Sequence, residues 1–330
     1  MRVSTIQFEP IDGDVDANLK FIEQNVYAAV RSGADFVAFP EMCILGYWHL
    51  TMRERDELLE LSEPADGPSV SRILDLAVRA NVGVGVGFLE RHGDDLFNSY
   101  AVCLPDGTAH VHRKIHAFEH EAISSGDRYT VFDTPWGVRM GVLICWDNNL
   151  VENVRITALL GADVLVAPHQ TGGTDSRSPY GMKKIPVELW RNRHSDPKSM
   201  RDAIRGANGR EWILRWLPSR AHDNGLFVVF SNGIGEDGGE IRTGNSMIID
   251  PYGRIVAETD AAGAAIVTAT LDLELLDMST GRRWIAGRKP ALYAPLIVSS
   301  GRERDARTAR FSEVPVSRPS FEPTDPPVSM

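Results

Sequence analysis

Gly141-Val142-Leu143-Ile144-Cys145-Trp146-Asp147 is the stretch with the strongest strand pattern in the chain. Its apolar run predicts a buried strand over residues 138–145, and the pattern after it predicts a helix over 151–160. A thiol at a strand-to-helix turn lies near the positive end of the helix dipole and near backbone N–H groups, which favour the thiolate and can hold an oxyanion. Cys145 is therefore a candidate nucleophile, although a lone cysteine at a strand end is more often an inert buried residue.

Strands and helices alternate on both sides of this stretch. Short runs rich in valine and isoleucine predict buried strands, and longer segments with apolar residues three or four apart predict covering helices, which together indicate a layered α/β domain. The segment 170–222 is a long excursion between two strands, and such excursions tend to be lids or subunit contacts. The predicted strands are 3–8, 36–39, 82–89, 98–104, 109–113, 138–145, 164–168, 226–232, 246–250 and 255–258, and the predicted helices are 16–32, 69–81, 151–160 and 210–217.

Two other predicted strands end in an isolated charged residue. Glu41 follows the strand 36–39 after one proline, and Lys114 directly follows the strand 109–113. Taken alone, each is more often a surface charge. A thiol, a carboxylate and an ammonium at one sheet edge form a chemically sensible set, because covalent attack on an amide needs a nucleophile, a proton carrier and a positive charge for the oxyanion.

The composition is that of an ordinary globular protein of 330 residues, long enough for one large domain or two modest ones. Its formal charge of -10 argues against a nucleic-acid partner, which would require clustered lysine and arginine. Three cysteines without a CxxC pair argue against a disulfide framework and a zinc knuckle. We see no secretion signal and no run of roughly 18 apolar residues, so we expect a cytoplasmic protein without a membrane partner.

Three ordered motifs around these residues closely resemble those of the nitrilase superfamily of carbon-nitrogen hydrolases, and the resemblance spans about residues 1–298. In this family a second glutamate positions the substrate, and Glu119 matches its spacing better than Glu121 does. The matched segments are 39–47 for the glutamate motif, 113–116 for the lysine motif and 141–147 for the nucleophile motif.

The resemblance implies a four-layer αββα sandwich that assembles into homodimers or larger homo-oligomers. It also implies that Cys145 attacks the carbonyl carbon of a small-molecule substrate. Glu41 would accept the thiol proton, return it to the departing ammonia or amine, and then activate water. Lys114 and the backbone N–H of Trp146 would stabilise the oxyanion. No cofactor and no metal are expected.

The sequence Cys-Trp-Asp at residues 145–147 bears on the substrate. It is closer to the Cys-Xaa-Asp of family amidases and carbamoylases than to the Cys-Trp-Glu of true nitrilases, which favours a small amide or an N-carbamoyl compound. A nitrile substrate is the alternative. A regulatory subunit without turnover is disfavoured, because the thiol, carboxylate and ammonium are all present. Transfer of the acyl group to an amine instead of water stays open.

The excursion at 170–222 is locally basic, with 11 lysine or arginine residues against 5 acids. A guanidinium matches a carboxylate in a two-pronged geometry, so an arginine here could bind a substrate carboxylate, although a subunit contact or a solvated surface is the more common role. Candidate substrate-binding residues are Trp146, His169 and Arg177. The arginines considered for a carboxylate are Arg177, Arg191, Arg193 and Arg205.

Three other patterns carry less weight. Histidines at every fourth position would align as metal ligands on a helix, but their segment is predicted to be strand and loop. Alternating glycines resemble a dinucleotide-binding loop without its third glycine or its helix. Tryptophans in the excursion could line an aromatic pocket, although two of them four apart are more often the buried face of a helix. These residues are His112, His116 and His120, then Gly83, Gly85 and Gly87, then Trp190, Trp212 and Trp216.

Two expectations concern the helix after Cys145 and the end of the chain. Glu152 and Arg155 complete the family pattern CxDxxxxExxR and lie three residues apart, so they are expected to form a structural ion pair on one helix face. Residues 299–330 are polar and proline-rich, and they are expected to form a tail outside the domain 1–298. Such a tail is either disordered or an arm lying on a partner subunit.

Overall fold

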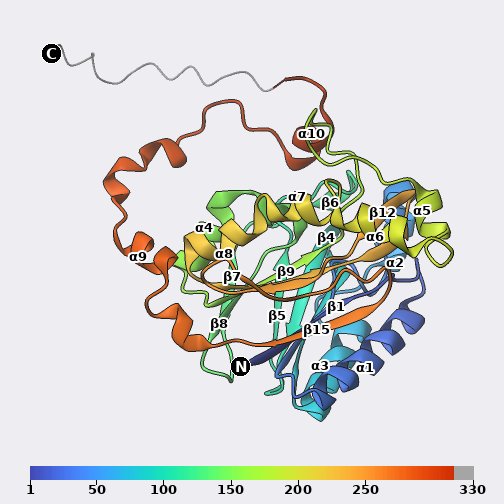
Figure 1. The fold of residues 1–330 in the computed structure, drawn as a ribbon, viewed down its shortest axis with the longest axis horizontal. Helices are drawn as coiled ribbons and strands as arrows, with labels where there is room; N and C mark the ends of the chain where they lie inside the picture. Colours follow the sequence, from blue (N-terminus) through green and yellow to red (C-terminus); the bar gives the residue numbers. More distant parts are fainter. Residues whose placement is uncertain (316–330) are drawn as a thin grey trace.

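Two large β-sheets pack face to face in the computed structural model, which describes residues 1–315 (Figure 1). The first has the order β15-β1-β2-β3-β4-β5 with β6 paired to β4, and the second has the order β14-β13-β10-β9-β8-β7. A hairpin of β11 and β12 forms a separate small sheet. The strands are β1 (Arg2–Gln7), β2 (Phe36–Ala38), β3 (Gly83–His92), β4 (Asp95–Cys103), β5 (Ala109–Arg113), β6 (Ile123–Ser124), β7 (Thr130–Asp133), β8 (Arg139–Val142), β9 (Val164–His169), β10 (Phe227–Asn232), β11 (Ile234–Asp237), β12 (Glu240–Thr243), β13 (Met247–Ile249), β14 (Ile255–Glu258) and β15 (Ala265–Thr270).

Helices cover the outer face of each sheet. α1 (Val15–Arg31) and α3 (Pro68–Ala80) each bury one apolar stripe against the first sheet. α4 (Val151–Leu159) and α8 (Leu217–Asn224) cover the second sheet. The facing surfaces of the two sheets enclose a further core, whose members include Phe36 and Tyr100 from one sheet and Val142 and Phe227 from the other. The predicted αββα sandwich is confirmed.

The excursion at 170–222 is more helical than predicted. It contains α5 (Val187–Arg191) and α6 (Pro197–Arg205), which the sequence analysis missed. The single helix predicted over 210–217 is wrong, because α7 (Arg210–Leu214) ends before α8 begins. Pro218 lies in the first turn of α8, where a missing N–H is tolerated, whereas inside a continuous helix it would break a hydrogen bond and clash with the preceding turn. None of the helices within residues 1–315 is long and apolar enough to cross a membrane.

The alternating glycines of β3 make room for neighbouring groups on one face of the first sheet. A Cβ atom at Gly85 would lie 2.7 Å from the Tyr100 ring, and one at Gly87 would lie 2.2 Å from the backbone N of Met42. Glycine therefore lets the turn that follows β2 approach the sheet closely. This packing, inside a strand, accounts for the pattern that resembled a dinucleotide-binding loop.

The chain leaves the sheets after β15. It passes through α9 (Thr280–Ala286) and an irregular stretch before α10 (Ala306–Phe311), and Figure 1 shows this segment as an arm that swings outward beyond α9 and returns at α10. The guanidinium of Arg307 donates to the carbonyl oxygen of Phe118 at 3.1 Å, so α10 lies on its own chain. The remainder of the predicted tail, residues 316–330, lies outside the described residues.

Candidate active site

Three turns bring Glu41, Lys114 and Cys145 to one end of the sandwich. Glu41 follows β2, Lys114 follows β5, and Cys145 follows β8 at the start of a short 3-10 helix, η2 (Cys145–Asn149). The strand predicted to reach Cys145 ends at Val142, because the chain turns away from the ladder there. Glu41 and Lys114 have no exposed surface, and Cys145 is 8% exposed. The thiol, the carboxylate and the ammonium therefore meet in a nearly dry site.

The Lys114 ammonium lies between two carboxylates. Its Nζ donates to Oε1 of Glu41 at 2.7 Å and also to Oε1 of Glu119. Nδ2 of Asn98 donates to the same two oxygens, at 2.7 and 3.0 Å. The hydroxyl of Tyr47 donates to Glu119 Oε1 at 3.2 Å. These bonds fix Lys114 and both carboxylates in one arrangement.

Burial and opposite charge compete in this cluster. Burial raises the pKa of Glu41 to about 7, although Lys114 and Asn98 act in the other direction. Burial also acts to raise the pKa of Glu119, but the charge and hydrogen bond of Lys114 hold it below its ordinary value. The pKa of Lys114 is raised because its carboxylate neighbours outweigh burial. Burial raises the pKa of the Cys145 thiol, so the resting thiol keeps its proton at neutral pH.

Glu41 keeps one oxygen available. Its Oε2 is buried and has no hydrogen-bond partner among the described residues, and a buried acceptor of this kind calls for a functional explanation. Gln170, directly after β9, links this residue to the nucleophile. Its Nε2 donates to the Glu41 carbonyl oxygen at 3.0 Å, and a hydrogen bond from its backbone acts to lower the pKa of the Cys145 thiol.

Asp147 ties the lysine turn to the cysteine turn. Its Oδ1 accepts from the backbone N–H of His116 at 2.8 Å, and its Oδ2 accepts from those of Ile144 and Ile115, both at 3.2 Å. The imidazoles of His112 and His116 lie 3.6 and 3.0 Å from its carboxylate. Burial acts to raise the pKa of Asp147, but the hydrogen bonds and charges of these two histidines hold it well below its ordinary value. Cys145 is held with a positive φ of 50°, a strained conformation that this network helps to fix.

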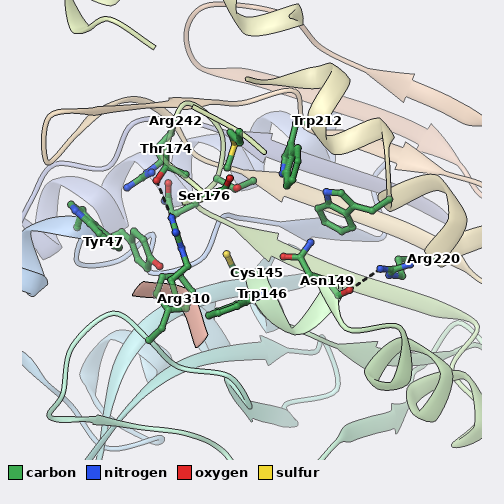
Figure 2. A pocket seen from close by; sticks show the side chains of 16 residues that line it. Tyr47, Cys145, Trp146, Asn149, Thr174, Ser176, Trp212, Arg220, Arg242 and Arg310 are labelled. Carbon is green, nitrogen blue, oxygen red and sulfur yellow. Dashed lines mark hydrogen bonds between the residues drawn. The ribbon is translucent and has the colours of Figure 1, made fainter. Parts of the chain in front are cut away.

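A cavity of about 320 Å³ opens over Cys145 (Figure 2). Figure 2 shows the sulfur of Cys145 among the side chains of Trp146, Asn149 and Arg310. Among residues 1–315, those that line the cavity include six aromatic residues, three arginines and no carboxylate. The lining residues are Tyr47, Trp48, Phe118, Cys145, Trp146, Asn149, Gln170, Thr171, Thr174, Ser176, Met182, Trp212, Trp216, Arg220, Arg242 and Arg310.

The arginines on the cavity wall differ from those considered in the sequence analysis. None of those four lines the cavity, because each is bound elsewhere on the chain. Their partners are Glu313 for Arg177, Glu236 for Arg191, the Trp190 carbonyl for Arg193 and Asp260 for Arg205. The basic excursion therefore docks against acidic residues of the rest of the chain.

Other predicted residues divide between the cavity and the core. Trp146 lines the cavity, whereas His169 is 1% exposed and packs behind the wall, where burial lowers its pKa to about 3. Trp212 and Trp216 line the cavity, which confirms the alternative of an aromatic pocket, although Trp216 also packs against the core of the second sheet. Trp190 packs instead in a separate core with α6.

Two smaller expectations are also decided by the contacts. Glu119 and not the exposed Glu121 reaches Lys114. Arg155 donates to the carbonyl oxygen of Asp223 at 2.9 Å, and within residues 1–315 it makes no ion pair with Glu152, so that predicted pair is wrong. The side chain of Arg155 points toward the neighbouring helix α8, which contains Asp223, whereas Glu152 is exposed to solvent.

Sequence reasoning gave no role to several residues of the site. Asn98 carries a signal, since it and Ser99 are polar residues within the buried and otherwise apolar stretch from Leu96 to Cys103. Asp147 lies inside the nucleophile motif, but its link to the lysine turn needs the three-dimensional structure. Arg310 carries no signal, because it belongs to a stretch with the composition of a tail.

The fold and this site are those of a carbon-nitrogen hydrolase. Residues 2–278 match the sequence model of the carbon-nitrogen hydrolase family, so the chain belongs to this family and is an enzyme of this type. An (R)-stereoselective amidase from Pseudomonas sp. is 32% identical over 287 residues, which cover 86% of this chain and 88% of the relative. The N-carbamoylputrescine amidase of Arabidopsis thaliana is 28% identical over 318 residues, 91% of this chain and 96% of that protein. The solved structure of an amidase from Nesterenkonia sp. shares the fold, with a TM-score of 0.63 at 18% identity over 87% of this chain and 96% of that chain.

Proposed function

We propose that this enzyme hydrolyses the C–N bond of a small amide or N-carbamoyl compound through a thioester on Cys145. The observation that carries this proposal is the placement of Cys145 on the cavity wall beside a buried lysine held by two carboxylates. Relatives with amidase and N-carbamoyl amidase activity support the same reaction class.

In the first half of the reaction, Glu41 accepts the Cys145 proton while Sγ attacks the carbonyl carbon. A carboxylate with a pKa of about 7 suits a general base at neutral pH, and its unpartnered Oε2 supplies the acceptor. Lys114 and the N–H of Trp146, in the first turn of η2, stabilise the oxyanion. The C–N bond then breaks, and Glu41 returns the proton to the departing nitrogen.

In the second half, Glu41 removes a proton from water as its oxygen attacks the thioester carbon. The C–S bond breaks, the carboxylic or carbamic acid leaves, and the proton returns to the thiol. Glu119 acts by positioning: it holds the Lys114 ammonium and shares Asn98 with Glu41. The Lys114 ammonium and both carboxylates are therefore already in position when a substrate binds.

The test is intact-protein mass spectrometry with parallel measurement of released ammonia. Wild type, Cys145→Ala and a control, Cys103→Ala, whose thiol is buried in the core away from the cavity, would be incubated with amides, N-carbamoyl amino acids and nitriles. We expect an acyl adduct and ammonia release that vanish only in Cys145→Ala. Turnover of nitriles alone would replace the amidase assignment with a nitrilase one, and an adduct that persists in Cys145→Ala would refute the nucleophile.

The proposal extends to assembly and location. Homodimers or larger homo-oligomers would cover the exposed apolar side chains Val151, Leu159 and Trp284 on α4 and α9, which are 54%, 42% and 52% exposed. A cytoplasmic location suits a catalytic thiol among three unpaired cysteines. Light scattering after size-exclusion chromatography measures the assembly, and a monomeric mass would contradict it.

A further inference from the structure

Resting on the proposed function, we propose that Arg310 binds a carboxylate of the substrate, so the enzyme prefers amides and N-carbamoyl compounds that carry an acid group. Arg310 belongs to α10, in the stretch 299–330 that was predicted to be a tail, either disordered or an arm lying on a partner subunit. Its side chain nevertheless lines the same cavity as Cys145 (Figure 2). The C-terminal segment thereby supplies a wall of the site.

Several contacts seat α10 at this position. The guanidinium of Arg307 donates to the carbonyl oxygens of Phe118 and Glu119, at 3.1 and 3.3 Å. The ring of Phe311 packs edge-on against that of Phe118, with centroids 6.1 Å apart. α10 is thus fastened to the loop that carries Glu119, and Phe118 in turn lies under the Lys114 ammonium, 4.5 Å from Nζ. Phe118 therefore contacts both α10 and the Lys114 ammonium of the active site.

The guanidinium of Arg310 has a buried N–H group without a hydrogen-bond partner among residues 1–315. Nη2 donates to the hydroxyl of Thr174 at 3.3 Å, whereas Nη1 is buried with no hydrogen-bond partner among residues 1–315. No carboxylate in that range forms an ion pair with it. Leaving a charged donor buried and unpaired is unfavourable, and a bound anion would relieve this cost. Thr174 and Ser176, which also line the cavity, supply hydroxyl groups beside it.

The other two arginines of the cavity differ from Arg310 in their partners. Arg220 donates to the carbonyl oxygens of Asn148 and Asn149, at 2.8 and 2.7 Å. Arg242 pairs with Asp237 and Glu240, at 2.8 and 3.2 Å, so two carboxylates neutralise its charge, although its Nη2 is buried without a hydrogen-bond partner among residues 1–315. Of the three arginines that line the cavity, Arg310 therefore combines a buried, unbound nitrogen with the lack of a carboxylate partner among residues 1–315.

The absence of a carboxylate from the described lining sharpens the expectation. A substrate with a terminal ammonium would face the Arg310 charge and find no opposite charge on the wall, whereas a terminal carboxylate would find a fork of N–H donors. We therefore expect the site to distinguish substrates by the sign of the charge on the end that lies away from the reacting C–N bond. This sets the expected specificity apart from that of a relative such as N-carbamoylputrescine amidase, whose named substrate ends in an amine.

The experiment compares kcat/KM for three N-carbamoyl compounds that share one spacer and end in a carboxylate, a methyl ester or an ammonium. The variants are wild type, Arg310→Gln and a control, Arg304→Gln, which removes an arginine of the same segment whose side chain contacts Ser312 and Val314 outside the cavity. We expect Arg310→Gln to lose about 10-fold to 100-fold in kcat/KM for the carboxylate compound, the size of a charge-assisted bond. The methyl ester should change by less than about 3-fold, and Arg304→Gln should match wild type on all three.

The proposal would be overturned by an equal loss on carboxylate and ester in Arg310→Gln, or by a wild-type preference for the ammonium compound. Turnover of the ester with no preference for the carboxylate would leave the proposed function standing without this inference. No turnover and no Cys145 adduct with any compound would count against the proposed function itself. Calorimetry of succinate binding then decides the inference separately, since weaker binding to Arg310→Gln than to wild type supports it and equal binding refutes it.

Discussion

The Nζ of Lys114 lies 2.7 Å from Oε1 of Glu41, yet burial raises the pKa of this carboxyl group to about 7. An ammonium at this distance ordinarily lowers the pKa of a carboxyl group, but full burial of both side chains outweighs that attraction. The Glu119 carboxylate acts in the same direction as burial, because its negative charge repels that of Glu41. The result is a base that can both accept and return a proton at neutral pH.

We expect kcat/KM to rise with pH through about 7, because the ionised form of Glu41 is the one that accepts the thiol proton. The hydrogen bond from Asn98 lowers the pKa of Glu41, so Asn98→Ala should move this limb to higher pH by up to about one unit. Ser99→Ala is the control, since Ser99 is next to Asn98 on β4 but its hydroxyl donates to Glu90 of β3, outside the cavity. A pH profile of Asn98→Ala that coincides with that of wild type would show that another group sets the limb.

Asp147→Asn should destabilise the protein by about 2 to 4 kcal/mol, because backbone donors from both turns and two imidazoles lose an ionised acceptor. The pKa of Asp147 is lowered in the folded protein, so its contribution is present above the unfolded value of 3.8 and is lost as pH falls below it. Urea unfolding at pH 7 and at acid pH measures both effects. A stability difference from wild type that stays constant down to low pH would contradict this assignment.

The sequence was sufficient to predict the sandwich and the three motif turns, because buried strands and amphipathic helices follow local periodicity and the motif residues occupy strand ends. The sequence was insufficient to predict which residues line the cavity, because the cavity wall is built from segments that are distant in the chain. The spacing of Trp212 favoured a buried helix face over a cavity wall, but α7 ends at Leu214 before α8 begins, and Trp212 lines the cavity. Arg310 could not be found, since its role depends on how an arm of polar composition folds back.

Gly87→Ala should impair catalysis with a modest loss of stability. Its Cβ would lie 2.2 Å from the backbone N of Met42 and 3.0 Å from the Cα of Glu41, so the turn that carries the base must shift. A displacement of roughly 1 Å at a reacting group can cost about 100-fold in rate. Gly263→Ala is the matched control, because a Cβ there meets nothing within 4 Å. Full activity of Gly87→Ala would mean that the turn tolerates the shift and that the close approach is only a packing feature.

Lys114→Met should be both inactive and unstable, and the two effects should separate in a double variant. Removing the ammonium leaves Glu41 and Glu119 buried together without a counter-charge, which should cost about 3 to 5 kcal/mol of folding free energy. Adding Glu119→Gln removes one of the two carboxylate charges, so the double variant should recover part of that stability in urea unfolding. Its rate of Cys145 acylation should stay about 100-fold or more below wild type, because the oxyanion still lacks the ammonium. Recovery of acylation together with stability would show that Lys114 supports the fold alone, whereas recovery of stability without acylation assigns it to the transition state as well.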